Sequence, residues 1–288
     1  MEKLFGAIEA GGTKFVCAVG TGPDDLRAEL RIPTSTPAAT IAAALAFFRE
    51  QAARGRPIAA LGVGSFGPVE LDLASPSWGH ITSTPKPGWA GTDLAGELGR
   101  GLGVPVAFET DVDAAALGEG RWGAAAGLDD FIYVTVGTGI GGGVVAGGRL
   151  VHGRQHPEIG HLRVRRDHAA DPFPGICPFH RDCLEGLAAG PAIAARWGKP
   201  AEELPADHPA WPLEARYLAE LAATLALVLS PRKILFGGGV LQQPQLLPLI
   251  RQHLPELLAG YLEAPEIAPP ALGPRAGLLG ALALAEDL

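Results

Sequence analysis

Four side chains that bind soft metal ions gather in the middle of this 288-residue chain. Cys177, His180 and Cys183 form a C-x2-H-x2-C pattern, and His161 lies upstream as a fourth ligand. Zinc prefers tetrahedral sets of Cys and His, and a site filled by four protein ligands keeps no open position for catalysis. A Cys177–Cys183 disulfide, or two ordinary thiols, is the alternative, but it leaves the histidines unexplained. The pattern therefore predicts a structural zinc site.

A second candidate group is acidic and follows a short strand pattern at 104–108. The chain continues there as Glu109-Thr110-Asp111-Val112-Asp113 and then enters an alanine-rich helix expected at 114–120. Aspartate is a preferred N-cap residue, so an ordinary helix start explains one of the two aspartates. Asp113 is well placed for that cap. We therefore predict that Asp111 is the functional carboxylate and points into a cleft.

Three glycine-rich turns have the composition of phosphate-binding loops. Gly11-Gly12-Thr13-Lys14 joins two expected strands, Gly137–Gly142 lies between two more, and Gly237–Gly239 follows a strand at 233–236. Backbone N–H groups in such turns can converge on an anion, although the first turn is equally typical of a plain hairpin. The second turn matches G-x-G-x-x-G, but strand residues follow it. Because a dinucleotide fold requires a helix at that point, a nicotinamide enzyme is excluded.

Hydrophobic periodicity and turn residues supply the elements that must position these groups. Helices are expected at 36–54, 93–102, 114–120, 184–197, 213–229, 244–258 and 275–287, and strands at 4–10, 14–19, 58–65, 104–108, 131–151 (a hairpin) and 233–236. The long loop 78–89 carries two tryptophans and suits a ligand-facing surface. A strand–glycine turn–strand plan occurs twice, so we predict an α/β protein with a duplicated lobe whose turns face each other across a cleft.

The composition excludes several classes of protein. Apolar residues make up 47% of the chain and charged residues 19%, as in globular proteins, and no apolar run reaches membrane-spanning length. A net charge of −8 argues against a nucleic-acid surface. The N-terminus begins directly with a strand pattern and shows no signal peptide, and three cysteines suit a reducing compartment. These features predict a cytoplasmic protein.

Taken in order, these motifs resemble the sugar kinases of the ROK family, most closely its zinc-containing bacterial fructokinase branch. The resemblance covers essentially the whole chain. Its motifs are EAGGTKF at 9–15, GSFGPV at 64–69, TPKPGW at 84–89, TDVDAAALGE at 110–119, TVGTGIGGG at 135–143, HPEIGH at 156–161, CPFHRDCLEG at 177–186 and FGGGV at 236–240. The E-x-G-H motif followed by a Cys/His cluster that ends in C-x-E is the most specific of them.

The resemblance implies a two-lobed actin-like (ribonuclease H-like) ATPase fold, with ATP and sugar in the cleft between the lobes. The smaller lobe is expected at 1–115 together with the C-terminal helix at about 275–288, and the larger lobe, with the zinc loop, at 116–274. A homodimer is also implied.

The resemblance assigns roles to individual residues of this chain. Asp111 is the expected catalytic base. The expected sugar-binding residues are Thr110, Glu158, His161, Glu185, Gly67 and Pro68. The expected ATP-binding residues are Gly11, Gly12, Thr13, Lys14, Thr135, Gly137, Thr138, Gly139, Gly237 and Gly238. The expected zinc ligands are His161, Cys177, His180 and Cys183. Magnesium is expected on the β- and γ-phosphates, with Glu9 reaching it through water.

Three departures from the family pattern bear on these expectations. Related kinases mostly have Asp where this chain has Glu9, and many have Asn at the positions of Thr110 and Asp113. Because the chain contains no asparagine, the last two changes look like general avoidance of that residue. The middle of the Cys/His cluster, C-P-F-H-R-D-C, follows the fructokinase branch and not the glucokinases.

The expected reaction is ATP-dependent phosphorylation of D-fructose at its 6-hydroxyl. A mannokinase or glucokinase is the close alternative. A sugar-responsive repressor, or another non-catalytic sugar-sensing relative, is a weaker one, because such repressors carry an N-terminal helix-turn-helix domain and this chain begins on the first phosphate-loop strand. Zinc then ties a loop that holds Glu158 and Glu185 toward the sugar, while Asp111 and ATP–magnesium perform the chemistry.

Overall fold

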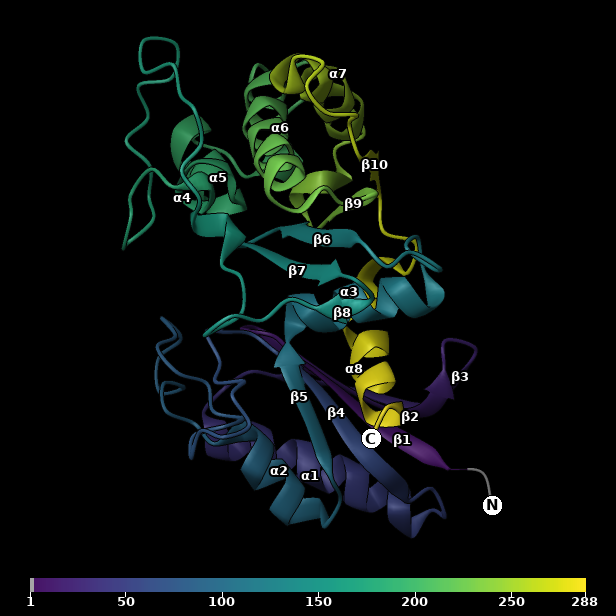
Figure 1. Cartoon of the computed structure of the whole chain (residues 1–288). Helices are drawn as coiled ribbons and strands as arrows, with labels where there is room; N and C mark the ends of the chain where they lie inside the picture. The colour runs from purple at the N-terminus through teal and green to yellow at the C-terminus, as the bar shows by residue number, and fades with distance from the viewer. Residues whose placement is uncertain (1–2) are drawn as a thin grey trace. The chain divides into compact units, whose positions relative to one another are not determined.

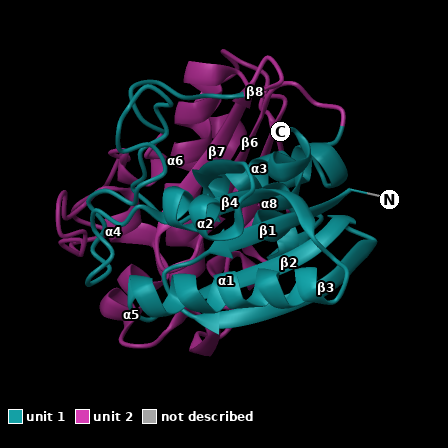
Figure 2. Cartoon of the chain, turned by 90° about the horizontal axis from the view of Figure 1, so that it is seen from below, with its two compact units in different colours: residues 1–126, 150–156, 271–288 teal, residues 127–149, 157–270 magenta. Residues whose placement is uncertain are grey.

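The computed structural model describes residues 3–288, which form two compact units. Unit 1 contains residues up to 126, a short strap at 150–156 and the C-terminal residues 271–288; unit 2 contains residues 127–149 and 157–270 (Figure 2). Each unit is built on one five-stranded mixed sheet with helices packed against it (Figure 1). No helix in the described part of the chain has both the length and the apolar surface needed to cross a membrane.

The sheet of unit 1 has the strand order β3-β2-β1-β4-β5. Its strands are β1 (Leu4–Ala10), β2 (Lys14–Gly22), β3 (Asp25–Pro33), β4 (Ile58–Ser65) and β5 (Val106–Thr110). β1 and β2 form the predicted antiparallel hairpin around the first glycine turn, whereas β4 and β5 extend the sheet in parallel from β1. The carboxyl ends of β1, β4 and β5 therefore lie at the same edge of the sheet. Glu9 lies near the end of β1, and the loop after Ser65 and residue Asp111 directly follow β4 and β5.

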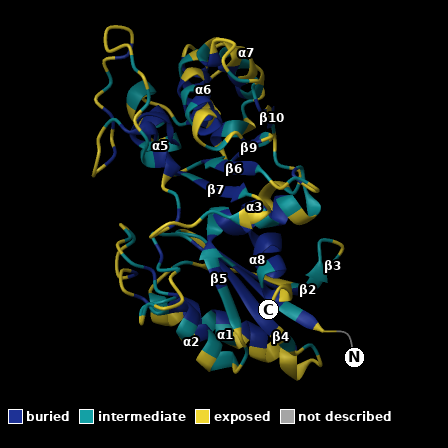
Figure 3. Cartoon of the chain, in the orientation of Figure 1, coloured by how far each residue is buried: buried dark blue, intermediate teal, exposed yellow. Residues whose placement is uncertain are grey.

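Alternating side chains of this sheet supply two apolar faces, as the period of two in a strand requires. Ile8 and Phe15 pack with α1 (Pro37–Ala53) and α2 (Leu94–Leu102) on one face. Their neighbours Ala7 and Val16 pack with α8 (Ala276–Glu286) on the other. Because both faces are covered, the strands of unit 1 are mostly buried (Figure 3).

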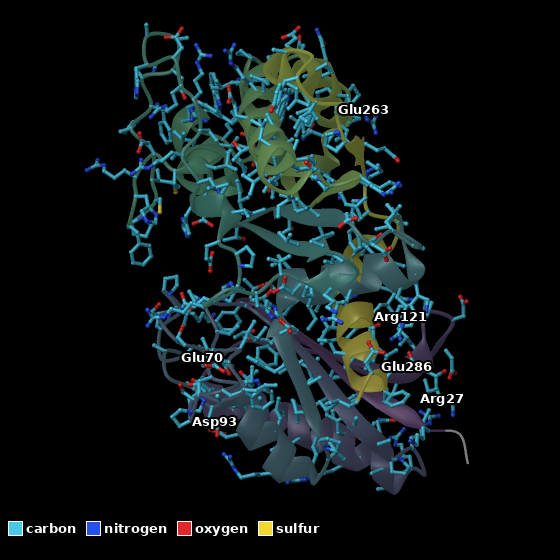
Figure 4. All side chains as sticks on the ribbon, in the orientation of Figure 1. Arg27, Glu70, Asp93, Arg121, Glu263 and Glu286 are labelled. Carbon is cyan, nitrogen blue, oxygen red and sulfur yellow. The ribbon has the colours of Figure 1, made fainter. Side chains whose placement is uncertain are left out.

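α8 also packs against α3 (Asp111–Trp122), the helix that begins with Asp111. Glycines let the two backbones approach: a Cβ on Gly118 would lie 2.6 Å from Ala276 O, and one on Gly280 would overlap Ala114 O. At the far end, Arg121 pairs with Glu286 at 3.1 Å and Asp287 at 2.7 Å, and Figure 4 shows Arg121 and Glu286 on the same side of α8. The helix that carries the predicted catalytic residue is therefore held along its whole length.

Unit 2 repeats the topology of unit 1, which confirms the predicted duplication. Its strands are β6 (Phe131–Val136), β7 (Ile140–Ala146), β8 (Arg149–Leu150), β9 (Lys233–Gly237) and β10 (Glu266–Ala268), in the order β10-β9-β6-β7-β8. β6 and β7 form the antiparallel hairpin, and β9 pairs in parallel with β6. The helices are α4 (Leu184–Ala188), α5 (Gly190–Trp197), α6 (Ala210–Leu229) and α7 (Leu246–Leu258).

The structure differs from the sequence-based prediction in one missed element and two expectations. The sequence pattern did not predict β3, an edge strand whose side chains are mostly partly or fully exposed. The helix expected at 184–197 is two helices, because Ala189 adopts an extended backbone (φ −69°, ψ 158°) between α4 and α5. Trp89 is not on a ligand-facing surface: it is fully buried against Phe15 and Phe66, and its indole N–H donates to Ser35 O.

Candidate active site

Asp111 stands at the junction of β5 and α3, as predicted, but Asp113 does not cap the helix. The N-cap is Thr110, whose hydroxyl accepts a hydrogen bond from Asp113 N at 3.0 Å. The same hydroxyl donates to Asp113 Oδ2 at 2.7 Å, so the Thr110 side chain is fully engaged and nearly buried. Threonine is an effective N-cap, and it draws Asp113 inward. Asp111 Oδ1 accepts only a local bond from Val112 N, at 2.9 Å.

Burial, and then the negative charge of Glu9, raise the pKa of Asp111 to about 7. Burial likewise raises the pKa of Glu9, whose carboxyl lies against Gly277 in the first turn of α8. A carboxyl group whose pKa is near neutral is suited to accept a proton from a hydroxyl. Unit 1 thus contains a candidate general base whose basicity is set by its surroundings.

The first glycine turn of unit 1 is fixed from its own hairpin and from the end of β3. Gly11 N donates to Lys14 O at 2.9 Å, Thr34 Oγ1 donates to Gly11 O at 2.7 Å, and Thr34 N donates to Thr13 O at 2.9 Å. No atom lies within 4 Å of the position that a Cβ of Gly12 would occupy. The turn is therefore rigid but open at Gly12, which suits the close approach of a phosphate.

The loop after β4 contains a cis Gly67–Pro68 peptide bond. Pro68 O accepts from Thr82 N at 2.8 Å and from Thr82 Oγ1 at 3.0 Å. The next amide, Val69 N, donates to His156 Nε2 at 3.3 Å. These bonds hold the two residues that the sequence predicts as sugar-binding in a single arrangement.

In unit 2, His161, Cys177, His180 and Cys183 come together as predicted. Their candidate ligand atoms all lie within 4.8 Å of one another, and none of the three cysteines, all in the described part of the chain, forms a disulfide. His161 Nδ1 is 3.4 Å from Cys183 Sγ and 3.8 Å from Cys177 Sγ, and His180 Nδ1 is 3.9 Å from Cys177 Sγ. Tetrahedral zinc, with bonds of about 2.3 Å to sulfur and about 2.0–2.1 Å to nitrogen, separates such atoms by about 3.5 Å. The four groups therefore fit one tetrahedral metal ion.

The protonation state of Cys183 would depend on whether a metal is bound. Burial first, and the neighbouring Cys177 thiol as well, raise the pKa of Cys183 to about 11. A divalent cation would reverse this shift, because it binds the thiolate form. Asp182, which lies between His180 and Cys183 in the chain, pairs with Arg163 and, at 3.4 Å, with Arg166. These ion pairs fix the segment that carries the cluster.

Glu185 connects the segment that carries Cys177, His180 and Cys183 to the second glycine turn. Its Oε2 accepts from Ile140 N at 3.0 Å, and a Cβ on Gly139 would lie 2.6 Å from the same oxygen. Gly190 N donates to Gly137 O at 2.8 Å, which fixes the turn from the start of α5. Glu158 precedes the 3-10 turn Ile159–His161, and its carbonyl accepts from His161 N at 3.0 Å. Both predicted sugar-binding glutamates therefore lie within three residues of a candidate metal ligand.

The remaining predicted nucleotide residues lie along the edge of the unit 2 sheet. Thr135 is on β6, and Thr138 lies in the turn between Gly137 and Gly139. Gly237 ends β9, and Gly238 follows with φ +94°, where a Cβ would lie 2.6 Å from Val136 N. Only glycine fits this contact, which brings the third glycine turn directly against the end of β6.

A second polar cluster was not predicted. Glu109, Asp113 and the strap residue His152 place their ligand-type atoms within 4.8 Å of one another in unit 1. His152 is 39 positions from Asp113 in a short run between glycines, so neither motif nor periodicity connects the two.

Comparison with known proteins identifies the relatives of this chain. A model of the ROK family matches residues 5–288. A fructokinase from Pediococcus pentosaceus is 43% identical over 287 residues, which cover 98% of this chain and 98% of that protein. The ROK hexokinase from Thermus thermophilus has a TM-score of 0.83 at 30% identity, with 99% of this chain and 98% of that chain covered. A ROK family glucokinase from Streptomyces griseus, solved with glucose and AMPPNP, has a TM-score of 0.78 at 27% identity, with 99% and 100% covered.

Proposed function

The chain belongs to the ROK family, and we propose that it phosphorylates D-fructose at the 6-hydroxyl with ATP. One observation carries the proposal: a fructokinase is 43% identical over nearly the full length of both chains. Asp111, with a carboxyl group of near-neutral pKa at the head of α3, agrees with it. The glucokinase solved with AMPPNP supports an adenine nucleotide as the phosphoryl donor.

We assign Asp111 as the general base of the reaction. It orients the 6-hydroxyl and accepts its proton while the oxygen forms a bond to the γ-phosphorus and the bond to the β-γ bridging oxygen breaks. The products are fructose 6-phosphate and ADP. Because phosphoryl transfer passes through a loose transition state, orientation and late proton acceptance suffice, and a strong base is not required.

Glu158, Glu185, His161, Gly67 and Pro68 are proposed to bind sugar hydroxyls. Carboxylates accept hydrogen bonds from hydroxyl groups well. Thr110 is proposed to contribute indirectly, because its own hydroxyl already bonds to Asp113. Its role is to set the position of Asp111.

The glycine turns are proposed to bind ATP. The turns at Gly11–Lys14 and at Thr135–Gly139 would hold the phosphates through backbone N–H groups, and Gly237 and Gly238 would lie along the nucleoside. A magnesium ion bound with ATP would supply charge neutralisation. Glu9 is the proposed partner of that ion through water, and its position beside Gly277 leaves its carboxyl within electrostatic reach of Asp111.

The four-residue cluster is proposed to hold a structural zinc ion. All four positions are filled by protein side chains, so the ion would serve to fix the loop between His161 and Cys183. Glu185 follows the last ligand by two residues, and its bond to Ile140 N would pass that rigidity to the second glycine turn. A homodimer is also proposed, and sedimentation equilibrium would measure it.

A glucokinase or mannokinase is the second candidate, because the glucokinase relative is solved with glucose. A coupled assay of ADP release on fructose, mannose, glucose and N-acetylhexosamines separates these functions. We expect the highest kcat/KM with fructose. A higher kcat/KM with glucose or mannose would transfer the assignment to that sugar, and no ADP release with any hexose would refute a kinase.

A further inference from the structure

The strap at 150–156 returns to unit 1 between two segments of unit 2 and carries two histidines into the unit 1 structure. His156 accepts from Val69 N. His152 lies against the two acidic residues that flank Asp111 in sequence: its Nε2 is 3.1 Å from Glu109 Oε2 and 3.7 Å from Asp113 Oδ2. One imidazole therefore contacts a carboxylate on each side of Asp111.

The carboxylates in this cluster need a positive partner. Asp113 is only 1% exposed, its Oδ2 already accepts from Thr110, and its Oδ1 has no hydrogen-bond partner among the described residues. Glu109 is also largely withdrawn from solvent, with a side chain 15% exposed. Two carboxylates at this depth, beside a third at Asp111, repel one another strongly unless a cation lies between them or one takes up a proton, and burial raises the pKa of Glu109.

The two carboxylates favour the charged form of His152 in this position. The carboxylates of Asp113 and Glu109 raise its pKa to about 10, although burial opposes the shift. The side chain is still 31% exposed, so water reaches its outer edge. The ring can therefore remain an imidazolium at neutral pH without a large desolvation cost.

We propose that His152 is a positioning residue for Asp111: its imidazolium bridges Glu109 and Asp113 and so holds the turn from β5 into α3 in one conformation. The inference rests on the proposed function of Asp111. Glu109 is the second-last residue of β5, and Asp113 lies in the first turn of α3. Asp111 lies between them in the chain. A bridge across these two positions fixes the backbone that carries the base, and it neutralises charge that would otherwise add to that of Asp111.

The test uses the full-length protein and the variants His152→Gln, Asp113→Asn and the double variant. We expect His152→Gln to lower kcat about 10- to 100-fold, since small displacements of a reacting group have effects of that size. The KM for ATP should stay within about twofold, because the ATP turns are separate from this cluster. The double variant should regain at least about fivefold in kcat over His152→Gln, because removing the Asp113 charge removes the need for the cation.

A purely structural anchor behaves differently. If His152 only held the strap, the double variant would be no more active than His152→Gln, and this result would overturn the inference. A kcat within twofold of the wild type in His152→Gln overturns it as well. Metal analysis can also overturn the inference. A metal equivalent present in the wild type and lost in His152→Gln would mean that Glu109, Asp113 and His152 bind a metal ion, and that no imidazolium bridges the two carboxylates.

The proposed function is tested separately in the same experiment. A wild type without turnover on any hexose overturns that function and this inference with it. Wild-type turnover combined with an unaffected His152→Gln variant overturns the inference alone. Circular-dichroism melting of each variant identifies loss of fold, and His152→Asn is the second variant to use if the glutamine variant melts early.

Discussion

Replacement of Asp111 by Asn is expected to abolish turnover and, at the same time, to stabilise the fold. The substitution keeps the oxygen that accepts from Val112 N and removes the ionisable group. Loss of a general base lowers kcat by about 10²- to 10⁴-fold. Fructose binding should change little, because the remaining sugar-binding side chains are untouched.

The gain in stability follows from the pKa of Asp111. The pKa rises from 3.8 to about 7 on folding, so the folded state holds the proton more tightly than the unfolded state does. Such a group contributes stability that is fully present below pH 3.8 and is lost as the pH rises to about 7. At 1.36 kcal/mol per unit, the charged carboxyl costs about 4 kcal/mol at pH 8, and partial access to solvent lowers this to about 2–4 kcal/mol. Asparagine has no such cost.

The assay compares wild type and Asp111→Asn by ADP release, by equilibrium dialysis with labelled fructose and by thermal melting at several pH values. With an unfolding entropy of about 2.1 cal/mol/K per residue, a gain of about 2–4 kcal/mol raises Tm by about 3–7 °C at pH 8. The gap should shrink to about a third of that at pH 5, since most of the cost accrues between pH 5 and pH 7. Asp207→Asn, at an exposed position, is the control and should change neither property.

Two results would refute this reasoning. A variant that retains more than a tenth of wild-type kcat cannot have lost its base. A Tm gap of the same size at pH 5 and pH 8 would mean that the carboxyl of Asp111 does not carry the raised pKa on which the calculation depends.

Three further predictions concern the pH dependence of the reaction, the packing of α3 on α8 and the Cys/His cluster. The kcat/KM of the wild type should fall as the pH drops below about 7, because protonated Asp111 cannot accept a proton; a flat profile from pH 8 to pH 5.5 would contradict its pKa. Gly280→Ala should lower the free energy of unfolding by at least about 1–3 kcal/mol and lower kcat, because the added methyl group overlaps Ala114 O. Gly22→Ala is the control and should change the stability little, because the space around Gly22 is open. Equal melting temperatures of the two variants would refute tight packing of α3 on α8. Cys177→Ser should reduce bound zinc and unit 2 stability together; a purified wild type without zinc by elemental analysis would show that the cluster is not a zinc site.

Elements with strong patterns were predicted from the sequence alone. The strands β1, β4 and β9 carry nearly continuous apolar runs, and their predicted bounds agree with the structure to within one residue. The hairpin at β6 and β7 was predicted because strand residues follow its glycine turn. The edge strand β3 was missed, because its sequence, DLRAELRIP, is polar: its backbone pairs with β2 while only Ile32 is buried. Strand formation there depends on the partner strand and not on side-chain hydrophobicity.

The candidate site also has features that the sequence predicts and contacts that only the structure reveals. The four Cys and His residues of the candidate metal site, the glycine turns and the acidic run around Asp111 are visible in the sequence, because each depends on residues that lie close together in the chain. The sequence could not decide which residue caps α3, since Thr110 and Asp113 have similar preferences and the choice depends on burial of Asp113. Nor could it reveal that His152 faces Glu109, or that Glu185 bonds to Ile140 N. Only the tertiary structure decided these contacts, because packing brings together side chains for which no periodicity or spacing exists, and it is their burial and charge that set the pKa of the base.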